Sequence, residues 1–259
     1  MIESPPEFPH AARIYEYLIG GSEYFPADAG AAEAMAGLIP SLRKWLPMLR
    51  DYLPRIAGEL YGQGFRRFVD FGSGLPHNHL HSALGADALV VYSDLDELVV
   101  ERGREIVRDV PNARFVRADL TAPRALLDDP AVRAFLGEQG PLAVGLSGVS
   151  VFFDPPVFAR ILDELYDALP GGSKLFVVFE TKGADLMTPA LETFAAMLAQ
   201  AGGVFRLYSV EESRAACGRW AVEHFLPLAE FLGRPAGFIS EADREGLELE
   251  FYSALLAKP

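Results

Sequence analysis

The feature that most constrains the fold is an alternation of short apolar runs with helical patterns, which begins at residue 66. The apolar runs are 67–71, 89–93, 114–118, 142–147, 174–180, 220–225 and 247–257. Helical patterns separate the first five runs, near 77–84, 97–109, 123–137 and 155–168. Strands that alternate with helices form a parallel sheet with helices on both faces, and buried parallel strands are almost continuously apolar. The sequence therefore predicts an α/β fold with a doubly wound, Rossmann-like sheet. The last two runs have fewer helical residues between them and could form an antiparallel pair at one edge.

The residues before this alternation show helical patterns and no strand signal. Three helical segments are expected there: 11–21, 27–38 and 41–62. Pro47 and Pro54 lie inside the third segment, and we expect them to kink or split that helix. The chain is therefore divided into an N-terminal arm with a helical cap, 1–62, and a second, ligand-binding domain, 63–259.

Charge and cysteine content restrict the partners and the setting of the protein. The net charge is −13 and the pI is about 4.8, and such an acidic surface repels nucleic-acid backbones. The single cysteine, Cys217, fits a reducing compartment, and the N-terminus lacks the pattern of a signal peptide. The longest apolar run, 142–153, is too short to span a membrane. We therefore expect a cytoplasmic protein with no nucleic-acid partner and no membrane partner.

A glycine-containing loop, 70–74, follows the first predicted strand and leads into a helix. Ligands of doubly wound sheets bind at this position. Gly72 and Gly74 let a ligand approach the backbone closely, and the helix that follows offers free N–H groups. A dinucleotide site would need a third glycine at position 77, where the chain has His77. The loop therefore favours a nucleotide-like ligand other than a dinucleotide.

Acidic residues follow the ends of the next two predicted strands. Asp94 ends the second strand, and its carboxylate can accept hydrogen bonds from both hydroxyls of a ribose. Asp96 is the alternative for this role. Asp119 ends the third strand and can receive an adenine amino group. Aspartate is also common at helix N-caps for structural reasons. The combination of these acids with the glycine loop nevertheless favours a ligand that contains a nucleoside.

Four segments, in this order and spacing, resemble a known class of enzymes: VDFGSG, VVYSDLD, RFVRADL and LPGGSKLFVVF. The class is that of the class I S-adenosylmethionine-dependent methyltransferases, and the resemblance covers residues 66–257. It implies a seven-stranded sheet of order 3-2-1-4-5-7-6, in which strand 7 is antiparallel. It also implies S-adenosyl-L-methionine as the cofactor and S-adenosyl-L-homocysteine as the product.

The N-terminal segment 12–28 is similar to the opening of one bacterial methyltransferase family, which was first catalogued as a domain of unknown function. That family typically begins with Ala-Arg-x-Tyr-Asp-Tyr-Leu-x-Gly-Gly, and 12–21 reads Ala-Arg-Ile-Tyr-Glu-Tyr-Leu-Ile-Gly-Gly. A Gly-x-Gly-Leu-Pro loop and a histidine, here His81, follow in the family. The chain departs from the pattern where Ser-Glu-Tyr-Phe replaces Lys-Asp-Asn-Phe, and the loop after Pro76 is shorter.

The resemblance implies a set of cofactor-binding residues but no catalytic residue. The loop residues would line the methionine part, Asp94 would hold the ribose, and Ser147 or Gly148 would border the sulfonium and the acceptor. The full set is Asp70, Gly72, Ser73, Gly74, Asp94, Leu95, Asp119, Leu120 and Ser147. We expect methyl transfer to a small-molecule acceptor, and a homodimer is an open alternative to a monomer. Two other functions stay open: a non-catalytic regulatory protein that binds S-adenosylmethionine and, less favoured, a dinucleotide-dependent oxidoreductase.

Candidate acceptor-binding residues lie in the predicted cap and after the fourth strand. Tyr15, Tyr24 and Phe25 could form a lid over the acceptor or simply pack the cap on the sheet, and both interpretations can hold together. Asp154 begins an Asp-Pro-Pro motif that resembles one found in amino-group methyltransferases. An Asp at the N-cap followed by Pro155 at the first helical position explains the same residues, and we favour that interpretation.

The three histidines of 77–81 raise the question of a metal site. His77 and His81 would lie one helical turn apart, but no nearby cysteine or carboxylate completes a site, while His79 would point elsewhere. We therefore expect no metal. Glu180 and His224 lie in or near later strands and could act as general bases, but we interpret both as structural.

Overall fold

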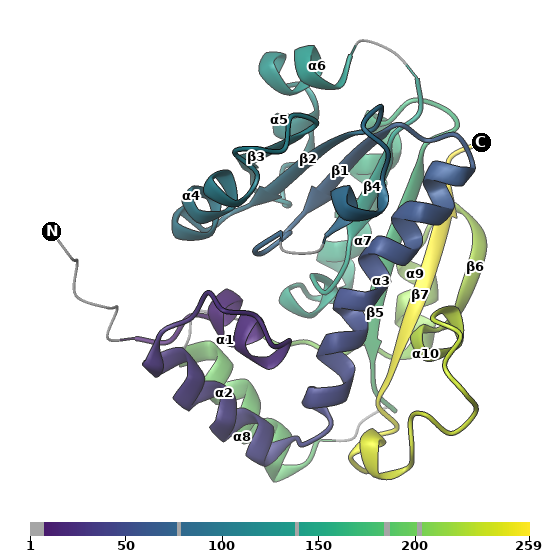
Figure 1. The fold of residues 1–259 in the computed structure, drawn as a ribbon. Helices are drawn as coiled ribbons and strands as arrows, with labels where there is room; N and C mark the ends of the chain where they lie inside the picture. Colours follow the sequence, from purple (N-terminus) through teal and green to yellow (C-terminus); the bar gives the residue numbers. More distant parts are fainter. Residues whose placement is uncertain (1–7, 77–78, 138–139, 184–186, 201–203) are drawn as a thin grey trace, which may run out of the picture.

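A seven-stranded sheet runs through the middle of the protein, with strand order β3-β2-β1-β4-β5-β7-β6 (Figure 1). The structure is a computed structural model and describes residues 8–76, 79–137, 140–183, 187–200 and 204–259. The strands are β1 (Arg67–Phe71), β2 (Leu89–Asp94), β3 (Ala113–Arg117), β4 (Ala143–Leu146), β5 (Lys174–Thr181), β6 (Ala221–Pro227) and β7 (Glu250–Ala257). β1 to β5 pair in parallel, and β7 is antiparallel to both β5 and β6. The predicted order and the predicted antiparallel edge pair are confirmed.

Helices cover both faces of the sheet, as the strand–helix alternation predicts (Figure 1). The helices are α1 (Ala11–Leu18), α2 (Pro26–Leu38), α3 (Leu42–Gly62), α4 (Glu97–Ile106), α5 (Pro123–Leu127), α6 (Pro130–Leu136), α7 (Pro155–Ala168), α8 (Pro189–Gln200), α9 (Val210–Ala216) and α10 (Leu228–Phe231). Short 3-10 turns occupy η1 (Leu80–Ala83), η2 (Ser150–Phe152) and η3 (Ala242–Arg244). One hydrophobic core contains residues of α3, α4 and α10, and the core on the other face contains residues of α5, α6, α7 and α9.

The helix α3 is continuous from residue 42 to residue 62, although Pro47 and Pro54 lie inside it. Of the two expected outcomes, splitting of the helix is therefore wrong, whereas a kink stays a prediction. Each internal proline costs about 3 kcal/mol, whereas a fully buried large apolar side chain contributes about 1.5–3 kcal/mol. One face of α3 is fully buried through several such side chains: Trp45, Met48, Tyr52, Ile56 and Leu60. Packing of this face on the sheet outweighs the local effect of the prolines.

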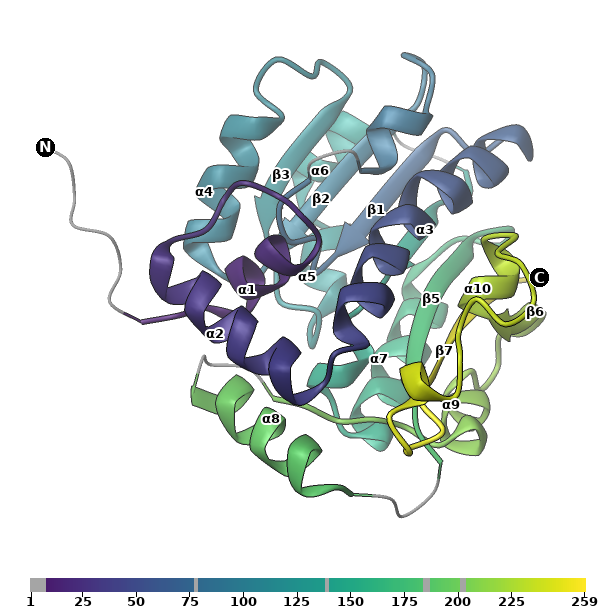
Figure 2. The same ribbon diagram turned by 60° about the horizontal axis from the view of Figure 1, so that its bottom comes forward.

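Helices from distant parts of the sequence cover the end of the sheet where the parallel strands finish (Figure 2). α1 packs against α2, and α8 packs against the other side of α2. We call α1, α2 and α8 together the lid. The sequence did not predict α8, which lies between β5 and β6. α3 shares one hydrophobic core with the sheet and the lid, and the domain division at residues 62 and 63 stays a prediction.

A search of the described residues finds no helix with both the length and the apolar character needed to cross a membrane.

Candidate active site

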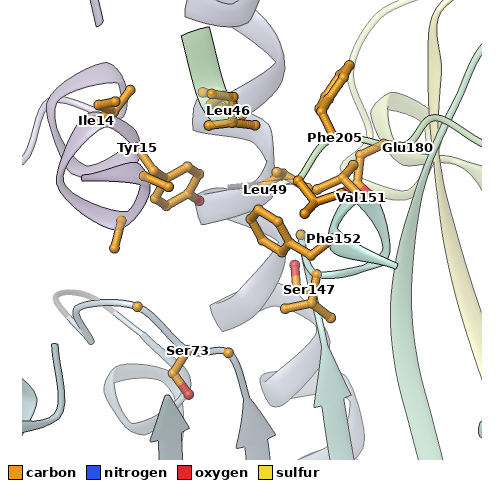
Figure 3. A pocket seen from close by; sticks show the side chains of 18 of the residues that line it. Ile14, Tyr15, Leu46, Leu49, Ser73, Ser147, Val151, Phe152, Glu180 and Phe205 are labelled. Atoms are coloured by element: carbon orange, nitrogen blue, oxygen red, sulfur yellow. The ribbon is translucent and has the colours of Figure 1, made fainter. Parts of the chain in front are cut away.

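A cavity of about 860 Å³ lies between the lid and the carboxyl ends of β1, β2, β4 and β5 (Figure 3). This volume is within the range of small-molecule sites, about 300–1,000 Å³. Figure 3 shows Ser73 and Ser147 at the strand ends, with Tyr15 and Leu46 on the side of the lid and α3. All nine residues predicted to bind the cofactor line this one cavity. The fold brings them together because carboxyl ends of neighbouring parallel strands meet at one edge of the sheet.

The glycine loop after β1 has a backbone that only glycine adopts easily. Gly72 and Gly74 have φ values of +63° and +58°. A Cβ atom at Gly72 would lie 2.5 Å from Val149 Cγ1, so the loop packs tightly against the segment after β4. A Cβ atom at Gly74 would meet no atom within 4 Å. Gly74 therefore leaves space for a ligand to approach the backbone directly.

Serine hydrogen bonds hold this loop in place. The backbone N–H of Ser73 donates to the Ser93 carbonyl at 2.9 Å, and the Ser73 hydroxyl donates to the Asp70 carbonyl at 2.9 Å. The Ser93 hydroxyl also donates to the Asp70 carbonyl, at 3.0 Å. The end of β1 is thereby tied to the end of β2, which pre-organises the loop for binding.

Asp70 places a buried carboxyl group at the wall of the cavity. Its Oδ1 atom has no hydrogen-bond partner among the described residues, and His79 Nδ1 lies 4.0 Å from Oδ2. A Cβ atom at Gly145 of β4 would lie 2.3 Å from Asp70 Oδ1, so the glycine makes room for this carboxyl. Burial raises the pKa of Asp70 to about 7. The group is therefore suited to receive a hydrogen-bond donor from a ligand.

Asp94 is held by the backbone on both carboxylate oxygens. The N–H of Gly74 donates to Oδ2 at 3.1 Å, and the N–H of Asp96 donates to Oδ1 at 3.0 Å. Each oxygen keeps a further lone pair for a hydroxyl group, and burial raises the pKa of Asp94. Asp96, the alternative, instead caps α4 through Val99 N–H and pairs with His10. The geometry favours Asp94 for binding two hydroxyls.

The adenine part of the predicted site lies after β3. Asp119 is exposed, and its Oδ1 accepts hydrogen bonds from the backbone N–H and the hydroxyl of Thr121, at 2.8 Å and 2.7 Å. Leu120 is buried beside it, whereas Leu95 after β2 is largely exposed. These side chains offer a polar edge and apolar surfaces for a planar ring.

The acceptor-side predictions have different outcomes. Tyr15 lines the cavity, and burial raises its pKa to about 12, so its hydroxyl stays protonated. Tyr24, Phe25 and Asp154 do not line the cavity. Tyr24 instead packs edge-on against Tyr17, with ring centroids 4.8 Å apart. The ring of Phe25 lies beneath the guanidinium group of Arg13, a residue of α1.

Asp154 occupies the N-cap position of α7, followed by Pro155, as the favoured interpretation predicted. Its side chain makes no capping hydrogen bond. It is exposed and forms an ion pair with Arg206 Nε at 2.7 Å. Asp154 is therefore a surface residue outside the cavity.

The N-terminal motif builds the lid. Asp28 is fully buried and accepts hydrogen bonds from Arg13 Nε at 2.7 Å and from the backbone N–H of His10 at 2.8 Å. Glu16 is also buried, and a Cβ atom at Gly21 would lie 1.9 Å from its Oε1 atom. The second glycine of the motif is therefore required by the side chain of Glu16.

Two side-chain contacts connect the N-terminal segments of the lid to the cofactor side of the cavity. His10 Nε2 lies 2.9 Å from Asp96 Oδ2. Arg102 of α4 contacts both oxygens of Glu23, at 2.8 Å and 2.7 Å. α4 begins three residues after Asp94, so these contacts join the lid to the helix next to the predicted ribose site.

The histidines do not act as one group. His79 is buried and lines the cavity, whereas the Nδ1 atom of His81 lies 2.8 Å from the Tyr92 hydroxyl. His77 lies outside the described residues. Among the residues that the structure describes, no group of three or more potential metal ligands is present, and the absence of a metal stays a prediction.

Sequence reasoning missed several residues of the cavity wall. Arg50 donates to the Leu75 carbonyl at 3.2 Å and pairs with Glu16 at 3.3 Å. Arg50 interrupts the apolar stripe of α3 between Leu49 and Leu53. A charged residue in such a stripe is a sequence signal for a polar group at a cavity wall. Phe205, by contrast, comes from the segment after α8 and has no local signal.

The fold, the glycine loop and the acidic strand ends define a class I S-adenosylmethionine-dependent methyltransferase. A family model described as S-adenosyl methyltransferase matches residues 4–216, and the chain belongs to this family. The dinucleotide-dependent oxidoreductase is thereby set aside. A search of curated proteins finds no match.

Solved structures agree with this assignment. A candidate methyltransferase of Thermobifida fusca YX is 28% identical, with a TM-score of 0.84, over 100% of this chain and 99% of that one. A DUF574 family protein of Streptomyces avermitilis MA-4680 is 27% identical, with a TM-score of 0.83, over 98% of each chain. Geranyl diphosphate C-methyltransferase of Streptomyces coelicolor A3(2), solved with S-adenosyl-L-homocysteine, shares the fold alone at 13% identity. Its TM-score is 0.55, over 98% of this chain and 100% of that one.

Proposed function

We propose that this enzyme transfers the methyl group of S-adenosylmethionine to a small, mostly apolar molecule bound beneath the lid. One observation carries the proposal: the cavity continues without a break from the polar strand ends to an apolar wall. That wall includes Leu18, Met35, Leu46, Leu53, Leu191 and Phe194. Apolar walls with a few placed polar groups are typical of small-molecule sites.

The residues present fit the cofactor. The Oδ1 atom of Asp70 lacks a protein partner among the described residues and can accept from the amino group of the methionine part. The space above Gly74 admits a ligand at the backbone, and Asp94 can bind the ribose hydroxyls. Asp119 and Leu120 would border the adenine. When bound, the cofactor supplies an electrophilic methyl group on a sulfonium.

The protein itself contributes alignment and a dry environment. Ser147 and Gly148 follow β4 and line the cavity between its polar and apolar parts. A group positioned there would meet the reacting atoms of both substrates, and holding them in line lowers the entropic part of the barrier. The lid, which contacts through His10 and Arg102 connect to the cofactor side, would limit the access of water to this region.

The same proposal covers partners and setting. A net charge of −13 supports a small molecule over a nucleic acid as the acceptor, and the single, buried Cys217 supports a cytoplasmic setting. A homodimer stays a prediction.

Binding and turnover test the proposal separately. Isothermal titration should show binding of both S-adenosylmethionine and S-adenosylhomocysteine, and Asp94→Ala should weaken it while Asp109→Ala, at an exposed turn, should not. Formation of S-adenosylhomocysteine is then measured with a panel of small apolar acceptors. Binding of neither ligand would overturn the proposal. Binding without turnover on any acceptor would favour the regulatory alternative.

A further inference from the structure

Glu180 is a buried carboxyl group that faces the cavity. It lies near the end of β5, its side chain is among the buried polar groups at 3% exposure, and it lines the cavity. The hydroxyl of Ser150 donates to Oε2. Oε1 has no hydrogen-bond partner among the described residues. Figure 3 shows this side chain on the same side of the cavity as Val151 and Phe205.

Strand register places Glu180 in the acceptor part of the cavity. Val177 of β5 pairs with Leu146, the last residue of β4. Glu180 follows three residues later, and at about 3.3 Å per residue it lies about 10 Å beyond that level. In Figure 1, β5 continues in this direction toward the end of the molecule where the lid lies. Glu180 is thus displaced from the glycine loop toward the apolar wall.

The burial of this carboxyl group is costly unless a ligand donates a hydrogen bond to its unpartnered oxygen. Among the described residues, no lysine or arginine forms an ion pair with Glu180, and burial raises its pKa to about 7. The titratable groups that interact with it, Tyr15 and Tyr208, both have a pKa raised by burial and are neutral at pH 7. A buried polar atom without a partner calls for a specific explanation. Here the position of Glu180 at the wall of the cavity provides one.

The surroundings of Glu180 favour a positively charged partner. Arg50, which also lines the cavity, is already paired with Glu16, and the carboxyl groups of Asp70, Asp94 and Asp119 line the part of the same cavity that is proposed for the cofactor. The aromatic rings of Phe152 and Phe205 also line the cavity. An ammonium group can satisfy a carboxylate and interact with aromatic faces, and it is attracted by the net negative charge.

We propose that Glu180 anchors the acceptor by binding an amino group, and that the acceptor is a mostly apolar small molecule that carries an amine. This inference rests on the proposed function. Glu180 is a positioning residue: the amine is held near the lid, while the atom that receives the methyl group lies closer to Ser147.

Head-group selectivity tests the inference without any variant. The protein is saturated with S-adenosylhomocysteine and titrated calorimetrically with 2-phenylethylamine, 2-phenylethanol and 3-phenylpropanoate. These probes have similar apolar bodies and differ in charge. A charge-assisted hydrogen bond corresponds to about a tenfold or larger difference, so the amine should bind at least about tenfold more tightly than the acid. Equal binding of amine and acid, or no binding of the amine, overturns the inference.

A matched pair of variants adds a second test. Glu180→Gln keeps the size of the side chain and should weaken 2-phenylethylamine about tenfold while leaving 2-phenylethanol and S-adenosylhomocysteine unchanged. Glu192→Gln, on the exposed surface of α8, should change nothing. An unchanged amine preference in Glu180→Gln would overturn the inference but leave the proposed function standing. Failure of S-adenosylhomocysteine to bind the wild type would remove the proposed function itself.

Discussion

Replacing Glu180 by glutamine should change how the stability of the protein depends on pH. In the folded protein burial raises the pKa of this carboxyl from 4.5 to about 7. The folded state therefore binds the proton more tightly than the unfolded state does. Its contribution is fully favourable below about pH 4.5 and is lost as the pH rises through 7. The difference of about 2.5 pKa units, at about 1.4 kcal/mol each, corresponds to about 3 kcal/mol above pH 7.

The assay is urea unfolding of the wild type and Glu180→Gln at pH 5 and at pH 8, without cofactor. Glutamine does not titrate, so the variant should gain about 2–3 kcal/mol relative to the wild type between these two pH values. Asp70 titrates in the same range because burial also raises its pKa to about 7. Its contribution is common to both proteins and cancels in the difference.

Parallel stability profiles for the two proteins would refute this reasoning, because they would show that Glu180 has an ordinary pKa and is solvated. Glu192→Gln is the matched control, and its profile should follow the wild type, since Glu192 is exposed. A variant that gains stability at pH 5 instead of pH 8 would show that the carboxylate has a cationic partner.

Three further changes test other parts of the structure. Asp94→Ala should weaken binding of S-adenosylhomocysteine by about 1–3 kcal/mol in calorimetry. Unchanged affinity would show that Asp94 is not the acid that binds the ribose. Gly72→Ala should lower the free energy of unfolding by about 1–3 kcal/mol, because of its positive φ and a 2.5 Å side-chain contact. Gly30→Ala, inside α2 with open space around it, should not lower it. Arg102→Ala should accelerate amide exchange in the lid about two- to fivefold, whereas Arg219→Ala should not; equal rates would show that the lid is held otherwise.

Local patterns predicted the strands of the sheet, and the family resemblance supplied their order. The first five apolar runs were placed within a residue or two of β1 to β5, because buried parallel strands carry continuous apolar side chains. The nine residues of the predicted cofactor site meet at one cavity because each lies at or just after a strand end that the topology brings to the same edge. Family resemblance supplied the position of the antiparallel strand β7 and the assignment of roles.

Tertiary packing decided the rest of the site. Tyr15 faces the cavity while Tyr24 and Phe25 do not, although all three lie in one short segment. α8 completes the lid, and Phe205 and Arg50 reach the wall through contacts between residues far apart in the sequence. A sequence pattern shows which side chains are apolar or charged within one element. It does not show which face of that element another, distant element will cover. That choice is made by the packing of the whole core, and here it determined the apolar wall of the cavity and the position of Glu180 beside it.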